Sequence, residues 1–159
     1  MNKLTKLADK YFSDKGSHKH NYTEVYEKYL SNFENKEIKL LEIGFAEGGS
    51  CSMWLDFFKN AQIFGADFYS KEDLKEYHLK NPYMENLTLS KKNLIERMEN
   101  VFNNERFTFL QLDQSSRSDL LSLNYNFDVI IDDGSHIHGD IQQSLGILCR
   151  KLNKGGYYF

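Results

Sequence analysis

The sequence predicts an α/β fold built on a doubly wound parallel sheet. From residue 38 onward, short runs rich in Ile, Leu, Val and Phe alternate with segments whose apolar residues recur at three- and four-residue steps. This alternation is typical of strands that are joined by crossover helices. Strands joined in this way lie parallel and are covered by helices on both faces. We therefore expect ligands to bind beyond the carboxyl ends of the strands.

Five strands are expected, over residues 38–43, 62–66, 107–112 and 127–131 and from Tyr157 onward. Helices are expected between them, over 50–59, 74–79, 91–102, 116–123 and 141–152, with a break near Pro82 and a turn over 153–156. Two earlier helices are expected over 4–11 and 23–33, the second with Thr23 as its N-cap. This divides the chain into an N-terminal helical segment, 1–37, expected as a substrate lid or oligomer contact, and a sheet domain, 38–159.

Composition excludes several classes of protein. A length of 159 residues suits one domain, and a formal net charge of −3 argues against a general nucleic-acid-binding module. The sequence holds no apolar run long enough to cross a membrane and no secretory signal. Its two cysteines, Cys51 and Cys149, form neither a metal-type pair nor a disulfide framework. We expect a reduced, cytoplasmic protein without membrane or nucleic-acid partners.

A glycine-rich loop follows the first expected strand, which carries Glu42. Gly44, Gly48 and Gly49 allow close approach of a ligand, and Ser50 can cap the helix that follows. A tight turn without a ligand is the alternative. Because Ala46 stands where a dinucleotide fingerprint needs glycine, an adenosyl ligand without a pyrophosphate fits better.

Acidic residues end the next two strands. Asp67 lies where a carboxylate accepts the hydroxyls of an adenosine ribose, and a solvated loop residue is the alternative. Asp113 and Gln114 follow the third strand and can meet the adenine, although Asp113 also suits a helix N-cap.

The most specific pattern is Asp132-Asp133-Gly134-Ser135-His136, which follows the fourth strand. Carboxylate oxygens suit Mg²⁺. Histidine residues in general titrate near neutral pH and suit removal of a proton from a hydroxyl. The alternatives are a carboxylate that caps a turn and a histidine without a chemical role. His138 is expected only to begin the next helix.

These residues resemble a known family. The runs LLEIGFAEGGSCSMW, FGADF, FDVIIDDGSHI and KGGYYF, together with Asp14-Lys15-Gly16-Ser17, are similar to class I S-adenosylmethionine-dependent methyltransferases. The strongest likeness is to the metal-dependent sugar O-methyltransferases of macrolide and aminocoumarin biosynthesis, the mycinamicin and novobiocin type. The resemblance implies a Rossmann-like sheet of the class I methyltransferase type, with N-terminal helices. It also implies methylation of a sugar hydroxyl on a glycan or glycosylated small molecule, with S-adenosyl-L-methionine and Mg²⁺ as cofactors.

The resemblance also assigns roles to residues. Glu42, Gly44, Gly48 and Ser50 would hold the amino-acid end of S-adenosylmethionine, and Asp132 would face the cofactor. Asp67 would bind the ribose, and Asp113 and Gln114 would lie beside the adenine. Asp133 would be a metal ligand, and His136 would be the general base that deprotonates the acceptor.

One departure from the family leaves other hypotheses open. The family's fifth strand ends in an acidic pair, whereas this sequence ends at Phe159, so we expect an incomplete fold that lacks the last strands. The first alternative is a truncated, non-catalytic S-adenosylmethionine-binding remnant or interaction module, and the second is an NAD-dependent oxidoreductase. A homo-oligomer is also expected as an option.

Overall fold

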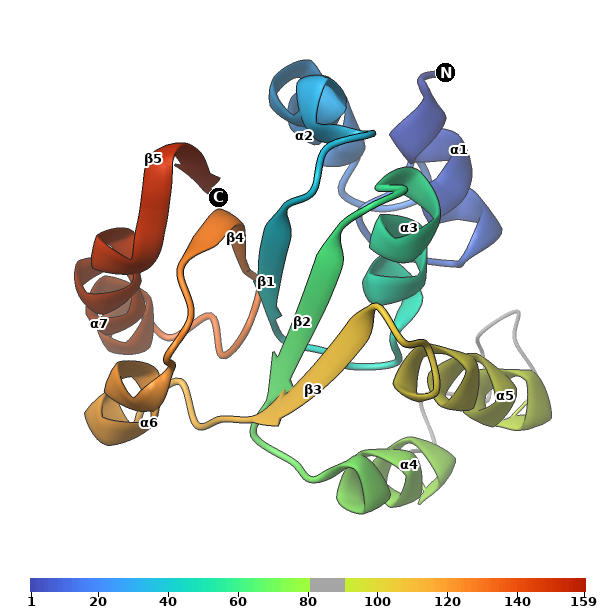
Figure 1. Ribbon diagram of the computed structural model, residues 1–159. Helices are drawn as coiled ribbons and strands as arrows, with labels where there is room; N and C mark the ends of the chain where they lie inside the picture. The colour runs from blue at the N-terminus through green and yellow to red at the C-terminus, as the bar shows by residue number, and fades with distance from the viewer. Residues whose placement is uncertain (81–90) are drawn as a thin grey trace.

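A five-stranded parallel sheet forms the centre of the molecule (Figure 1). The structure is a computed structural model that describes residues 1–80 and 91–159, so the expected break near Pro82 lies outside the described residues. The strands lie in the order β3-β2-β1-β4-β5. They are β1 (Lys39–Ile43), β2 (Gln62–Asp67), β3 (Phe107–Gln111), β4 (Phe127–Asp132) and β5 (Leu152–Tyr158). The doubly wound parallel sheet is therefore confirmed, and its order reverses between β1 and β4.

The expected helices are present in the described residues, with ends that shift by a few positions. They are α1 (Lys3–Lys10), α2 (Thr23–Leu30), α3 (Gly49–Phe57), α4 (Lys71–Lys80), α5 (Lys91–Phe102), α6 (Arg117–Ser122) and α7 (His138–Leu148). Short 3₁₀ turns over Ser31–Phe33 and Cys149–Lys151 extend α2 and α7. His138 begins α7, as expected.

Two apolar layers cover the two faces of the sheet. Successive strand residues point to opposite faces, so Leu40 of β1 belongs to one core cluster and Leu41 to the other. The first cluster includes Trp54 of α3 and Met98 of α5, and the second includes Ile147 of α7. Figure 1 shows α6 and α7 on one side of the sheet and α3 and α5 on the other.

The N-terminal helices belong to the first of these cores. Leu4 and Ala8 of α1 and Tyr26 and Leu30 of α2 are buried in the same cluster as Trp54. The N-terminal segment therefore packs directly on α3 and on the sheet behind it.

The expected N-cap at Thr23 is wrong. The position before α2 is held by Tyr22, whose side chain makes no capping hydrogen bond. Thr23 is fully buried, and its hydroxyl pairs with the hydroxyl of Thr5 at 2.7 Å. Because α1 and α2 pack against each other here, the hydroxyl is used between helices rather than at the helix end.

The turn expected over 153–156 lies inside β5, as an irregularity in its pairing. Phe127 pairs with Leu152, but Val129 pairs with Tyr157, so β5 carries extra residues between these two pairs. Gly155 has a φ of +83°, in the left-handed region that favours glycine. A glycine pair therefore lets the chain bulge and then resume pairing.

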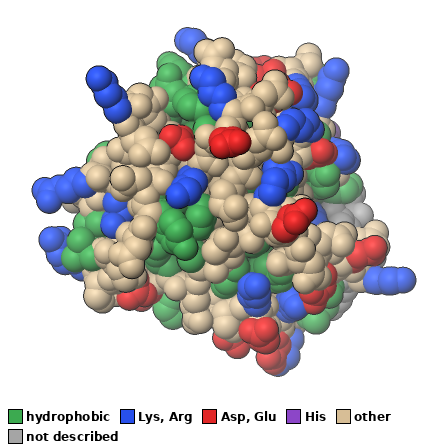
Figure 2. All heavy atoms as spheres, in the orientation of Figure 1, with side chains coloured by type: hydrophobic (Ala, Val, Ile, Leu, Met, Phe, Trp, Pro, Cys, Tyr) green, Lys and Arg blue, Asp and Glu red, His purple; other side chains and the backbone are tan. Residues whose placement is uncertain are grey.

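Charged side chains of both signs are interspersed on the face shown in Figure 2, with apolar side chains between them. None of the helices within residues 1–80 and 91–159 combines the length and apolar content that crossing a membrane requires.

Candidate ligand-binding site at the carboxyl edge of the sheet

A cavity of about 1120 Å³ opens beside the carboxyl ends of β1, β2, β3 and β4. Its walls come from the loops after these strands and from the segment between α1 and α2. Seven of the residues predicted to form the site line it: Gly44, Ser50, Asp67, Asp113, Gln114, Asp133 and His136. The predicted residues Glu42, Gly48 and Asp132 lie outside its lining. The parallel sheet thus brings residues from distant parts of the sequence to one edge.

Gly44 allows the ends of β1 and β4 to approach each other. Its φ is +95°, and a Cβ built on it would lie 2.1 Å from the carbonyl oxygen of Asp133. Gly48 has a φ of +73° and directly precedes α3, and a Cβ there would lie 2.8 Å from the ring of Phe45. Both positions therefore require glycine for reasons of backbone and packing, in addition to any contact with a ligand.

Glu42 is fully buried and tied to the first turns of α3. Its Oε2 accepts hydrogen bonds from the Ser50 hydroxyl at 2.7 Å, the Cys51 thiol at 3.3 Å and the Trp54 indole at 3.1 Å. Burial, and then the charge of Glu42, raises the pKa of the Cys51 thiol. The other oxygen, Oε1, accepts no hydrogen bond from the described residues and lies 3.2 Å from Nζ of Lys15.

Lys15 is a site residue to which the sequence assigned no role. Its ammonium is almost fully buried, lies between Glu42 and Asp133, and donates to Asp133 Oδ2. Burial alone would lower the pKa of Lys15, but the charges of Glu42, Asp133 and Asp14 outweigh it and raise this pKa above its usual value. The only sequence signal was its place in the Asp14–Ser17 segment of the resemblance. A lysine in a polar run otherwise looks solvated.

Asp67 binds the backbone of the loop after β1, whereas Asp113 binds Ser115 of its own loop. Asp67 Oδ2 accepts from the amides of Phe45 at 3.1 Å and Ala46 at 3.2 Å, which holds the glycine-rich loop against β2. Asp113 Oδ1 accepts from the amide and the hydroxyl of Ser115, at 2.8 and 2.7 Å. A carboxylate has about four acceptor positions, so both side chains keep sites for a ligand.

Gln114 and Asp132 form a polar network beneath the cavity. Gln114 Nε2 donates to Asp132 Oδ1 at 2.7 Å and to the Ser144 hydroxyl at 2.9 Å, and its Oε1 accepts from the Ser135 amide at 2.8 Å. The Tyr158 hydroxyl donates to Asp132 Oδ2 at 2.6 Å. Burial, and then this bond, raises the pKa of Tyr158. The network joins the ends of β3, β4 and β5 to α7.

Asp133 and His136 lie together at the mouth of the cavity. Nε2 of His136 is 3.8 Å from Asp133 Oδ1, and the imidazole is 73% exposed. His136 has a φ of +59°, which is uncommon for a residue other than glycine. Such backbone strain is often found at functional sites. The pair can take a proton from a ligand that enters the cavity.

The described residues do not by themselves form a magnesium site. Within residues 1–80 and 91–159, no three or more His, Cys, Asp or Glu side chains gather closely enough to hold a metal ion. Asp133 is the one predicted ligand, and one of its oxygens already binds the ammonium of Lys15. Asp133 could contribute one oxygen ligand, and a metal would need other donors as well.

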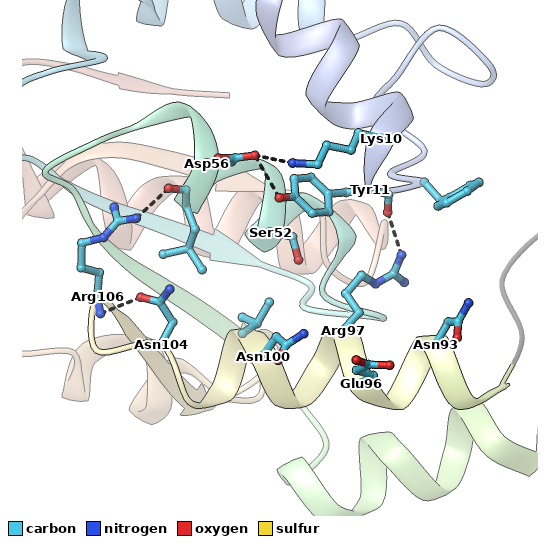
Figure 3. A pocket seen from close by; sticks show the side chains of 13 residues that line it. Lys10, Tyr11, Ser52, Asp56, Asn93, Glu96, Arg97, Asn100, Asn104 and Arg106 are labelled. Carbon is cyan, nitrogen blue, oxygen red and sulfur yellow. Dashed lines mark hydrogen bonds and ion pairs between the residues drawn. The ribbon is translucent and has the colours of Figure 1, made fainter.

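A second cavity, of about 460 Å³, lies between the end of α1, α3 and α5 (Figure 3). Lys10 and the Tyr11 hydroxyl both donate to Asp56 at 2.9 Å, and Arg97 donates to the Tyr11 carbonyl at 2.7 Å. Arg106 donates to a backbone carbonyl of α3 at 2.7 Å. No predicted site residue lines this cavity, and the charged groups named here are satisfied by the protein itself.

Comparisons with known proteins find relatives among sugar O-methyltransferases. No family model matches the chain. Over 98% of its length, it is 27% identical to mycinamicin VI 2''-O-methyltransferase of Micromonospora griseorubida and covers 34% of that protein. It is 29% identical, again over 98% of its length, to 8-demethyl-8-alpha-L-rhamnosyl tetracenomycin-C 2'-O-methyltransferase of Streptomyces olivaceus, of which it covers 36%. The chain therefore spans about a third of the length of these relatives.

Solved structures agree with these relatives. The MycE methyltransferase of the mycinamycin pathway, solved in complex with Mg and SAH, matches 99% of this chain with a TM-score of 0.76 and 26% identity. The match covers 36% of the MycE chain. The glycopeptide N-methyltransferase MtfA matches 86% of this chain and 51% of its own, with a TM-score of 0.52 and 13% identity, which shows the fold alone. The chain thus has the class I methyltransferase fold and resembles sugar O-methyltransferases of macrolide and tetracenomycin pathways.

Proposed function

We propose that this chain forms the cofactor-binding part of an S-adenosylmethionine-dependent O-methyltransferase that acts on a sugar hydroxyl of a glycan or glycosylated small molecule. The observation that carries the proposal is the cavity into which the glycine-rich loop, Asp67 and the Asp133–His136 pair converge. The similarity to sugar O-methyltransferases over 98% of the chain supports it. The relatives named above are methyltransferases, which favours this function over an NAD-dependent oxidoreductase.

The proposed cofactor lies along the carboxyl edge of the sheet. Its amino-acid end would meet the loop from Gly44 to Ser50, where Glu42 keeps one oxygen without a hydrogen bond and the first amides of α3 favour a carboxylate. Asp67 would accept the ribose hydroxyls, and Asp113 would lie beside the adenine. Gln114 would also lie beside the adenine while it holds Asp132, which would support the site from below.

The proposed reaction is a displacement at the methyl carbon of the sulfonium. His136 would accept the proton of the acceptor hydroxyl at Nε2, and Asp133 Oδ1, at 3.8 Å, would stabilise the imidazolium that forms. The hydroxyl oxygen would then bond to the methyl carbon while the carbon–sulfur bond breaks and its electron pair stays on sulfur. Positioning of the two reactants in one cavity would supply most of the rate enhancement.

Divalent-metal assistance is the finer part of this proposal. MycE was solved with Mg and SAH, and also with Mg, SAH and Mycinamycin VI. A divalent ion bound at Asp133, with further donors besides the described side chains, would hold and acidify the acceptor hydroxyl.

A methyl-transfer assay tests the function directly. The chain is incubated with methyl-labelled S-adenosylmethionine and glycosylated macrolide or tetracenomycin acceptors, once with Mg²⁺ and once with excess EDTA. We expect labelled product that depends on the metal. Turnover that is unchanged in EDTA would remove metal assistance from the proposal. Calorimetric binding of SAH without turnover would favour the non-catalytic cofactor-binding module, and failure to bind either SAH or S-adenosylmethionine would overturn both.

The remaining expectations stay predictions. They are a cytoplasmic location, the absence of nucleic-acid and membrane partners, a homo-oligomer, and a role for residues 1–37 as a substrate lid or oligomer contact.

A further inference from the structure

Lys15 reaches the cavity from a tightly folded segment between α1 and α2. Ser17 donates to the Asp9 carboxylate through its amide at 2.9 Å and its hydroxyl at 2.7 Å. A Cβ on Gly16 would lie 2.3 Å from the same carboxylate, so the segment and α1 are in close contact. The Thr23 amide donates to the carbonyl of Lys15 at 3.2 Å, which ties the segment to the start of α2. The lysine backbone is therefore held from both sides.

The charges around this ammonium do not balance. Glu42 is fully buried, Lys15 is 2% exposed, and Asp133 is partly buried, so two carboxylates share one ammonium. Glu42 Oε1 lies 3.2 Å from Nζ but accepts no hydrogen bond from the described residues. A buried oxygen without a hydrogen bond is costly even beside a cation, and so is an excess of buried negative charge. A ligand that carries an ammonium group would satisfy both.

We propose that Lys15 is a positioning residue for the amino-acid end of the bound cofactor. Its ammonium holds the Glu42 and Asp133 carboxylates at one point, and the negative charge left over at this end of the cavity attracts the ammonium group of the cofactor. This inference rests on the proposed function, because it takes the ligand to be an adenosyl amino acid. It adds Lys15 to the proposed cofactor site, although this residue lies between α1 and α2 and not at the end of a strand.

The position of Lys15 limits its effect to one end of the ligand. Its ion pairs are with Glu42, Asp133 and the adjacent Asp14, whereas Asp67 and Asp113 belong to the loops after β2 and β3. Loss of the lysine therefore disturbs the amino-acid end and leaves the nucleoside end in place.

Two ligands separate these ends in a calorimetric experiment. S-adenosylhomocysteine carries the amino-acid end, and 5′-methylthioadenosine lacks it. We expect Lys15→Met to weaken binding of S-adenosylhomocysteine by about ten- to a hundredfold, the usual cost of a lost hydrogen bond to a charged group. Binding of 5′-methylthioadenosine is expected to change by less than about threefold, which is within the scatter for a residue that does not touch the ligand.

Lys6→Met is the matched control, because Lys6 is an exposed lysine of the neighbouring helix α1 that does not line the cavity. We expect this variant to bind both ligands as the wild type does. Should Lys15→Met fail to fold, Lys15→Gln, which keeps a hydrogen-bond donor but loses the charge, is expected to show the same selective loss.

Several results would overturn the inference. An equal loss of both ligands in Lys15→Met would show a merely structural role, as would failure of both variants to fold. Unchanged binding of S-adenosylhomocysteine would remove the role altogether. If the wild type binds neither ligand, both the inference and the proposed function fail. The preceding outcomes would overturn the inference alone.

Discussion

His136 combines an exposed imidazole, a neighbouring carboxylate and a left-handed backbone. Its φ of +59° resembles the +54° of Asn21, a residue type that adopts this region more easily. Residues in this conformation store about 1–3 kcal/mol of strain and persist only where the surroundings hold them. Here the conformation directs the imidazole to the mouth of the cavity, within 3.8 Å of Asp133.

His136→Asn should therefore lower methyl transfer without loss of the fold. Asn suits the left-handed backbone but cannot accept the proton, so we expect the rate to fall by about 10²- to 10⁴-fold. The affinity for S-adenosylhomocysteine should stay within about threefold, since the exposed imidazole is proposed to act on the acceptor hydroxyl and not to hold the cofactor. The rate is measured with labelled cofactor. His138→Asn, at the start of α7, is the control, and an equal loss in that variant would contradict the role of His136.

Asp67→Asn tests the ribose end of the cavity. The carboxylate already accepts from the amides of Phe45 and Ala46, and an amide group would lose acceptor capacity toward both the loop and the ribose. We expect binding of S-adenosylhomocysteine and 5′-methylthioadenosine to weaken alike, by about tenfold or more. Calorimetry measures both. Glu72→Gln, at an exposed position of α4, is expected to leave both unchanged, and a loss confined to S-adenosylhomocysteine would contradict the assignment.

At the residue scale, the sequence identified the residues that follow the strand ends. It did not predict which partners their side chains contact. Residues after a parallel strand reach the same edge, so Asp67, Asp113 and His136 could be brought together on pattern alone. Burial of Lys15 depends on the folded segment that carries it, and a local pattern does not report such a long-range contact. The role of Gln114 as a link between strands and α7 depends on tertiary contacts in the same way.

At the scale of elements, Gly44 determines how closely the carboxyl ends of β1 and β4 can approach each other. Gly44→Ala should destabilise the protein by about 3 kcal/mol, because the new Cβ would lie 2.1 Å from a backbone carbonyl and the φ of +95° disfavours alanine. Gly146→Ala is the matched control. It lies well within α7 with nothing within 4 Å of its Cβ position, so we expect stability to rise by about 0.5–1 kcal/mol. Urea unfolding measures both, and equal effects would contradict the close approach.

His78 makes α4 sensitive to acid. Burial lowers its pKa, against the opposing charges of Glu47 and Asp67. In the unfolded chain the imidazole takes up its proton near its ordinary pKa of 6.5, so the unfolded state binds more protons below that pH. Its contribution to stability is complete above this pH and is lost as the pH falls below it.

His78→Gln should therefore reduce the pH dependence of folding. Between about pH 7.5 and pH 5, we expect the variant to lose less of its free energy of unfolding than the wild type loses. Urea unfolding at several pH values measures this difference. His138→Gln, at an exposed position, should keep the wild-type profile, and a steeper profile in His78→Gln would contradict the prediction.

The elements themselves were largely predictable because apolar periodicity is a local property. It located α3, α5 and the first four strands within a few residues, whereas β5 begins at Leu152 and not at Tyr157 as expected. The errors lie where tertiary contacts decide, as at Thr23, whose hydroxyl pairs with Thr5, and in β5, where a bulge replaces the expected turn.

At the scale of the whole molecule, the two ends of the described chain meet over the sheet. The Tyr26 ring of α2 contacts Phe159 with ring centroids 5.1 Å apart, and Tyr157 contacts Phe33 at 6.1 Å. The N-terminal helices thus join the last strand in one apolar layer, and the same N-terminal region carries Lys15 into the cavity. The cavity is lined by residues that range from Phe12 to Asp140, so a bound ligand would contact distant parts of the chain at once.

Ligand binding should therefore stabilise the fold as a unit. A ligand at a hundred times its Kd adds about 2.7 kcal/mol if it binds only the folded state, which corresponds to a rise in Tm of about 5–10 °C for a chain of this size. We expect S-adenosylhomocysteine to produce this rise in a thermal unfolding experiment, as one transition. NAD⁺ at the same concentration should leave Tm unchanged, because the loop lacks the glycine pattern that a pyrophosphate requires. A rise with NAD⁺ and none with S-adenosylhomocysteine would favour the oxidoreductase and contradict the adenosyl amino-acid site.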